Sequence, residues 1–172
     1  SKLDELAYHT INMAVERLFV GENSRMAERF KYCEEMYTTK VEMDNWIERM
    51  IGRIIGRKRE KIRRNELFID SCKRNYVSSY VEVARNLLNQ IYPQIGDINL
   101  KVDALITVWK AVEQADRYSS YRFSDYFSAI REYLKKEAKN IIEKYREEIS
   151  RKVEEYAKLA NSGESNYGIR LS

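Results

Sequence analysis

The densest group of chemically active side chains in this chain is a run of cations at residues 49–64, which reads RMIGRIIGRKREKIRR. Eight of these sixteen residues are Arg or Lys and only Glu60 opposes them, so the segment carries seven net positive charges. The whole chain has a net charge of +4, so the residues outside this segment have a net charge of −3. A positive field concentrated in one short element is typical of contact with a polyanion.

The basic segment has two faces if it is placed on a helix at about 100° per residue. One arc is apolar and is expected to face the core; it holds Ile47, Met50, Ile51, Ile54, Ile55 and Ile62. The other arc is cationic and contains two glycines, which each cost up to about 1 kcal/mol of helix stability but let a bulky surface approach the backbone. We therefore predict a nucleic-acid-binding site made of Arg49, Gly52, Arg53, Gly56, Arg57, Lys58, Arg59, Lys61, Arg63 and Arg64.

Three other interpretations of this segment stay open. The cations could form a solvated face that pairs with glutamates of neighbouring helices. The glycines could mark a break between two short helices. A membrane-surface helix is a third interpretation, although no aromatic anchor lies on the apolar face between residues 47 and 62.

A second group of cations and aromatic rings contains Arg117, Tyr118, Tyr121 and Arg122, followed by Tyr126. Interleaved Arg and Tyr side chains can bind phosphates and stack on bases, so these residues are secondary candidates for a nucleic-acid contact or an interface. The alternative is a loop that packs between helices.

The sequence contains no known catalytic signature. His9 is the only histidine, and there is no catalytic triad, metal-binding motif or glycine-rich nucleotide loop. Adjacent carboxylates such as Glu34 and Glu35 point about 100° apart on a helix and do not face each other. We expect no enzyme activity, no metal and no cofactor. Cys33 and Cys72 are expected to be small core residues, with a disulfide left open.

The composition predicts an all-α fold, because helix-forming residues dominate and the chain has one proline and six glycines. We expect a bundle of about five or six helices with one long C-terminal helix, a single domain over residues 1–160 and a tail over 161–172. The expected helices cover about 2–19, 24–37, 39–64, 66–91, 98–115 and 124–160, with Asn23 or Ser24, Thr39 and Ser124 as caps. No apolar run is long enough to span a membrane, and no secretory leader is visible.

The last predicted helix has an eleven-residue repeat. One line is Phe127, Ala138, Ile149 and Ala160; a second is Leu134, Tyr145 and Tyr156; a third, Ile130 and Ile141, fails at Lys152. A period of about 3.67 residues per turn keeps such a seam on one side of a long, nearly straight helix. This helix could therefore need a partner along part of its length.

The small, tyrosine-rich, cysteine-poor chain, with its cationic segment RMIGRIIGRKREKIRR in the first half, resembles the major coat proteins of filamentous viruses of hyperthermophilic archaea. That resemblance implies a helical bundle whose N-terminal helices wrap DNA and whose related copies stack into a helical nucleocapsid. It transfers no individual residue role.

From these observations we expect a structural protein that coats nucleic acid, first of all double-stranded DNA, without sequence specificity, and that resides in a virion. Its other partner would be a second copy or a related coat chain. If all eight cations bound duplex phosphates, log affinity would fall against log salt with a slope of about −7. The alternative is a cytoplasmic accessory subunit of a DNA replication or repair complex, and a helical nuclease is a third possibility.

Overall fold

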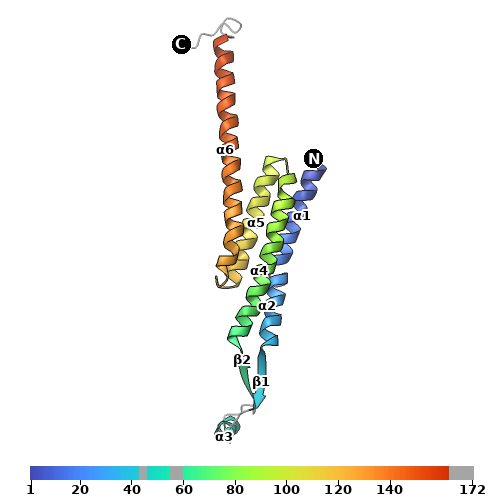
Figure 1. Cartoon of the computed structure of the whole chain (residues 1–172), viewed down its shortest axis with the longest axis vertical. Coiled ribbons are helices and arrows are strands. Elements are labelled where there is room, and N and C mark those ends of the chain that lie inside the picture. Colours follow the sequence, from blue (N-terminus) through green and yellow to red (C-terminus); the bar gives the residue numbers. More distant parts are fainter. Residues whose placement is uncertain (43–45, 55–59, 163–172) are drawn as a thin grey trace. The chain divides into compact units, whose positions relative to one another are not determined.

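The protein is an all-α helical bundle with one long C-terminal helix (Figure 1). The computed structural model describes residues 1–42, 46–54 and 60–162. Its elements are α1 (Lys2–Phe19), α2 (Arg25–Met36), β1 (Thr38–Glu42), α3 (Trp46–Ile54), β2 (Glu60–Arg64), α4 (Glu66–Gln90), the 3-10 helix η1 (Tyr92–Gln94), α5 (Ile98–Tyr118) and α6 (Ser124–Ser162). The contacts divide the chain into two units, Ser1–Arg131 and Glu132–Ser172, and each is considered by itself.

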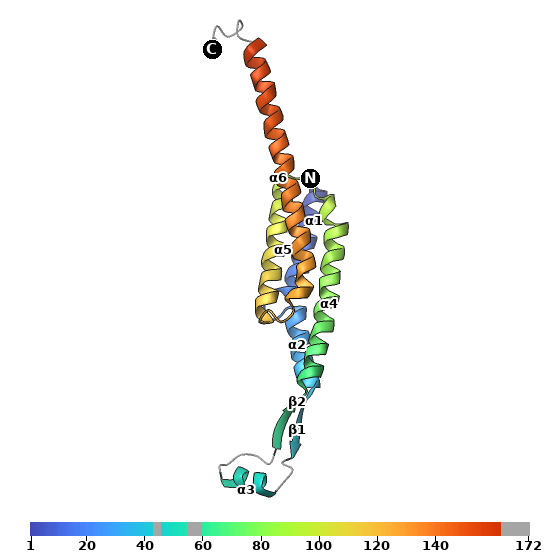
Figure 2. The same ribbon diagram turned by 60° about the vertical axis from the view of Figure 1, so that its left-hand side comes forward.

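In the first unit, α1 packs against α5, and α2 packs against α4 (Figures 1 and 2). The turn between α1 and α2 contains Gly21 with φ +85°, a left-handed conformation that other residues adopt only with strain. The Ser24 hydroxyl then accepts a hydrogen bond from the Ala27 amide at 3.1 Å and caps α2, as expected. Asn65 and Asp97 cap α4 and α5 in the same way.

The core of this unit lies between α1, α2, α4, α5 and the first turns of α6. Edge-to-face ring pairs join Phe19 to Phe127 and Phe30 to Phe123, with centroids 5.9 and 5.8 Å apart. Buried aliphatic side chains fill the space around them, and they include Ile11, Val15, Met26, Val77, Leu88, Val108, Val112 and Ile130. Burying each such side chain contributes about 1.5–3 kcal/mol, so this core stabilises the helices that carry the site.

The expected helix over about 39–64 is wrong. Residues 38–42 and 60–64 pair as an antiparallel hairpin, with Thr38 opposite Arg64 and Glu42 opposite Glu60. Of the residues described between these strands, those of α3 are helical. Glycines weaken a helix, and β-branched Val41 and Ile62 favour strands. The alternative of two short helices separated at the glycines is not what the described residues form, because Gly52 lies inside α3 and residues 60–64 are a strand; Gly56 lies outside the described residues. The Asn65 amide donates to the Tyr37 carbonyl at 2.9 Å and closes the hairpin onto α2 and α4.

The connection from α5 to α6 is shorter than expected, because α5 continues to Tyr118. Ser120 and Tyr121 have left-handed φ values of 54° and 60°. Ser124 starts α6, and its hydroxyl donates to the buried Asp116 carboxylate at 2.8 Å. Asp116 also forms an ion pair with Arg131 at 2.8 Å. This buried carboxylate of α5 therefore contacts two residues of α6, Ser124 and Arg131.

The second unit contains the remainder of α6 to Ser162. The expected C-terminal tail, 161–172, lies outside the described residues except for the last two residues of this helix. None of the helices that the structure describes has the length and apolar character needed to cross a bilayer.

Candidate nucleic-acid interface

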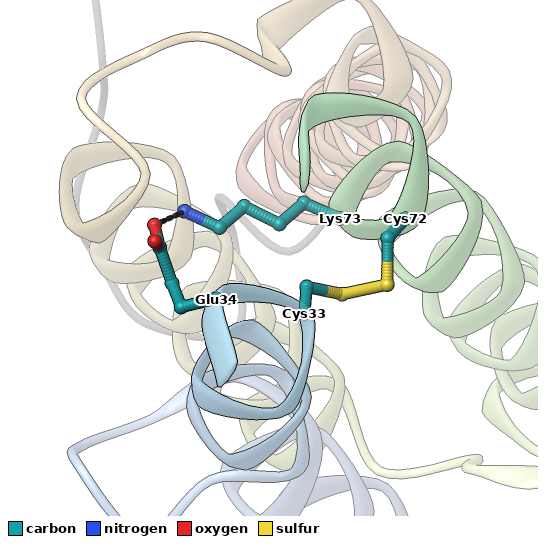
Figure 3. The surroundings of a disulfide bond; sticks show 4 residues. All are labelled: Cys33, Glu34, Cys72 and Lys73. Atoms are coloured by element: carbon teal, nitrogen blue, oxygen red, sulfur yellow. Dashed lines mark hydrogen bonds and ion pairs between the residues drawn. A yellow bond between two sulfur atoms is a disulfide. The ribbon is translucent and has the colours of Figure 1, made fainter. Parts of the chain in front are cut away.

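The segment 38–64, which we call the hairpin insertion, leaves the bundle between α2 and α4. A disulfide between Cys33 and Cys72 joins these two helices, with Cα atoms 5.7 Å apart (Figure 3). The expectation of two separate core thiols is therefore wrong, and the disulfide that the sequence left open is present. The cysteines are 39 residues apart, and they meet because α2 and α4 lie side by side, which no local pattern predicts.

Next to the disulfide, Glu34 forms ion pairs with two cations, Arg64 at the end of β2 and Lys73 of α4. One carboxylate oxygen lies 2.7 Å from Lys73 Nζ (Figure 3), and the other lies 2.7 Å from an Arg64 guanidinium nitrogen. The hydrogen bond from Lys73 and the charges of Lys73 and Arg64 lower the pKa of Glu34 against the opposing effect of burial.

Arg64 also binds Glu66 at 2.9 Å, and its pKa is raised by the Glu66 hydrogen bond and the Glu34 charge. This predicted binding residue therefore already has two carboxylate partners in the structure.

The cations of α3 are in a different situation. Arg49 and Arg53 are exposed and form no ion pair with the part of the chain that the structure describes. Arg63 is exposed on β2. Gly52 is buried, so its backbone is not the open surface that the sequence predicted. Gly56, Arg57, Lys58 and Arg59 lie outside the described residues, and Lys61 is placed only as a residue of β2.

The apolar face of α3 is exposed rather than packed in the core, which corrects a second expectation. Its side chains are between 49% and 79% exposed, and they are Trp46, Ile47, Met50, Ile51 and Ile54. At about 100° per residue, Gly52 lies roughly opposite this face. Trp46 was missed as an aromatic anchor because it precedes residue 47, where the predicted apolar face begins.

The secondary candidates lie at the end of α5 and in the loop that follows. Arg122 forms an ion pair with Asp70 at 3.2 Å, and Asp70 also binds Arg74 at 2.9 Å. The Tyr118 ring centroid lies 6.1 Å from that of Phe30, although all four candidates, Arg117, Tyr118, Tyr121 and Arg122, are exposed. These contacts favour the alternative of a loop that packs against the helices.

Arg64 and Arg122 line the same cavity of about 240 Å³, so the fold brings one member of each predicted group together. The other charged residues of its lining are Glu34, Glu66, Asp70 and Lys73. Three cations thus face three carboxylates, and the cavity offers little net charge to an incoming anion. Arg49 and Arg53 of α3, in contrast, have no ion-pair partner in the described part of the chain.

Among the described residues, no group of His, Cys, Asp and Glu side chains has an arrangement suited to a metal ion. His9 is exposed and lies beside Tyr8, with ring centroids 5.3 Å apart. No protein-family model, no curated protein and no solved structure matches this chain.

Proposed function

We propose that this protein binds the phosphate backbone of nucleic acid through α3 and the adjoining cations of residues 49–64. One observation carries the proposal: Arg49 and Arg53 are exposed without an ion-pair partner in the described part of the chain. Several other cations of the first unit contact carboxylates, among them Arg64, Lys73, Arg74, Arg85, Arg122 and Arg131.

An unpaired guanidinium breaks no internal ion pair when it binds a phosphate, and its planar fork matches two phosphate oxygens. The net charge of −3 outside the basic segment keeps this attraction local to the hairpin insertion. Contacts to phosphates position a protein on a duplex but read no bases, so little sequence preference is expected. Packaging of double-stranded DNA by many copies in a virion is the role that this binding mode and the resemblance to filamentous-virus coat proteins support.

The proposal is tested with the double variant Arg49→Ala/Arg53→Ala. Fluorescence anisotropy on duplex DNA of arbitrary sequence is measured across a salt series, since each lost phosphate contact reduces the slope of log affinity against log salt by about 0.9. The slope is expected to become shallower by about 1.8. The matched control is Arg17→Ala/Lys110→Ala, which removes two exposed cations of the bundle and should keep the wild-type slope. An unchanged slope in the α3 variant would contradict the proposal.

Electron microscopy of the protein from its natural source separates the packaging role from the accessory-subunit alternative. A coat protein forms long regular filaments that contain nucleic acid. A replication or repair accessory subunit stays a small oligomer with a defined protein partner.

The exposed apolar face of α3 favours a second candidate, an anionic membrane surface. A helix with Trp and Ile on one side and Arg beside them can lie in the headgroup region of a bilayer. Co-sedimentation with phosphatidylserine vesicles distinguishes the two. Membrane binding would be lost in Ile51→Ser/Ile54→Ser, whereas binding to duplex DNA would be retained.

A further inference from the structure

The second unit has an exposed apolar stripe that the proposed nucleic-acid contact does not use. Along α6 the side chains of the stripe are between 47% and 74% exposed, and they are Ile142, Tyr145, Ile149, Val153 and Tyr156. Leu159 is exposed close to the same stripe. Large apolar side chains that recur on one face of a helix mark a surface that packs against a partner.

The spacing of this stripe is symmetric. From Ala138 to Ala160, through the five residues of the stripe, the steps are four, three, four, four, three and four residues. The eleven-residue period holds all seven positions on one face of a nearly straight helix. The pattern reads the same in both chain directions, and its centre is Ile149.

We propose that a second copy of this chain covers the stripe, with its α6 antiparallel and the two Ile149 side chains meeting at a two-fold axis. In that arrangement Ile142 lies opposite Tyr156 of the second copy, and Tyr145 lies opposite its Val153. Each tyrosine ring faces a smaller aliphatic side chain, which suits close packing. In a parallel pair, each tyrosine would instead lie opposite the same tyrosine of the second copy. A symmetric, self-complementary patch is the requirement for a two-fold homodimer.

The charges beside the stripe suit a second copy of the same helix. Residues 141–160 contain five acidic and five basic residues, so two copies do not repel each other. Glu148 and Lys152 border the stripe on the same side when the helix is viewed with a period of about 3.67 residues. In the antiparallel pair each Glu148 therefore lies near Lys152 of the second copy, and two such contacts form about the axis. Leu159 lies on this side too, near Ile141 of the second copy.

In the proposed packaging role, the dimer would be a contact between copies of the protein. That role rests on the proposed function, whereas the existence of the dimer does not. Light scattering of the purified full chain without nucleic acid is expected to give twice the chain mass of 20.5 kDa. Ile149→Arg should give the mass of a single chain with its helix content retained by circular dichroism. The matched control is Asn140→Arg, which adds the same charge on the opposite face and should leave the dimer intact.

Cysteine cross-linking tests the direction of pairing. A mixture of Ile142→Cys and Tyr156→Cys chains should form an intermolecular disulfide that peptide mapping assigns to positions 142 and 156, whereas Ile142→Cys alone should not cross-link. The inference would be overturned if Ile142→Cys alone cross-linked and the mixture did not, or if the wild-type protein had the mass of a monomer.

The two proposals fail separately. A monomer that binds DNA would refute the dimer and leave the proposed function standing. A dimer that does not bind DNA would refute the proposed function and leave the dimer standing.

Discussion

Glu34 shows how one carboxylate sets the charge balance at the base of the hairpin insertion. It binds Lys73 and Arg64, and these cations lower its pKa below the ordinary value of 4.5. A lowered pKa means that the native state holds the charged form more strongly than the unfolded chain does. The resulting stability is present above the unfolded pKa and is lost as the pH falls through the folded one.

We therefore predict that Glu34→Gln lowers the free energy of unfolding by about 1 kcal/mol at pH 7 and by less at pH 3. Urea denaturation at the two pH values measures the difference. Glu35→Gln changes the neighbouring exposed carboxylate and should have little effect at either pH. Equal losses for Glu34→Gln at both pH values would show that its ion pairs do not contribute.

At the scale of elements, the disulfide is the strongest constraint on the hairpin insertion, because the insertion lies within the loop that the disulfide closes. Cys33 and Cys72 are 39 residues apart. Closing a loop of this length is expected to stabilise the fold by about 3–4 kcal/mol, mostly by restricting the unfolded chain.

We predict that Cys33→Ala/Cys72→Ala lowers the melting temperature by roughly 10 °C for a chain of this size. Differential scanning calorimetry measures the change. Reductant should lower the melting temperature of the wild type similarly and leave that of the double variant unchanged. An unchanged melting temperature in the variant would argue against a stabilising disulfide.

For the whole molecule, the two proposals together predict bivalent binding. A dimer presents two copies of α3, and the second contact with one long duplex is intramolecular, which raises the overall affinity without a new contact. Ile149→Arg should therefore weaken binding to a long duplex by about tenfold or more, while binding to a duplex too short for two copies changes little. Anisotropy with duplexes of two lengths measures this. Equal affinities of variant and wild type for the long duplex would indicate that the two copies do not bind together.

The fold class and most helix boundaries could be predicted from the sequence because they depend on local signals. Apolar residues at three- and four-residue spacing identify the buried faces, and Ser24 caps its helix through a contact within the next turn. The concentration of positive charge in residues 49–64 could also be predicted, because it depends on composition alone and not on the fold.

The tertiary structure decided which predicted cations have internal partners. Arg64 meets Glu34 of α2, and Arg122 meets Asp70 of α4, so each ion pair joins elements that are far apart in the sequence. No local pattern contains that information. The exposure of Arg49 and Arg53 is likewise a property of the folded chain.

The sequence by itself determined an all-α chain with one strongly basic segment, since periodicity and charge act over a few residues. Only the tertiary structure decided that the described residues of this segment form a short helix and a strand, that Cys33 pairs with Cys72, and that the apolar face of α3 is left exposed. The reason is physical: a helix face is buried only if another element packs on it, and which elements meet depends on the whole chain.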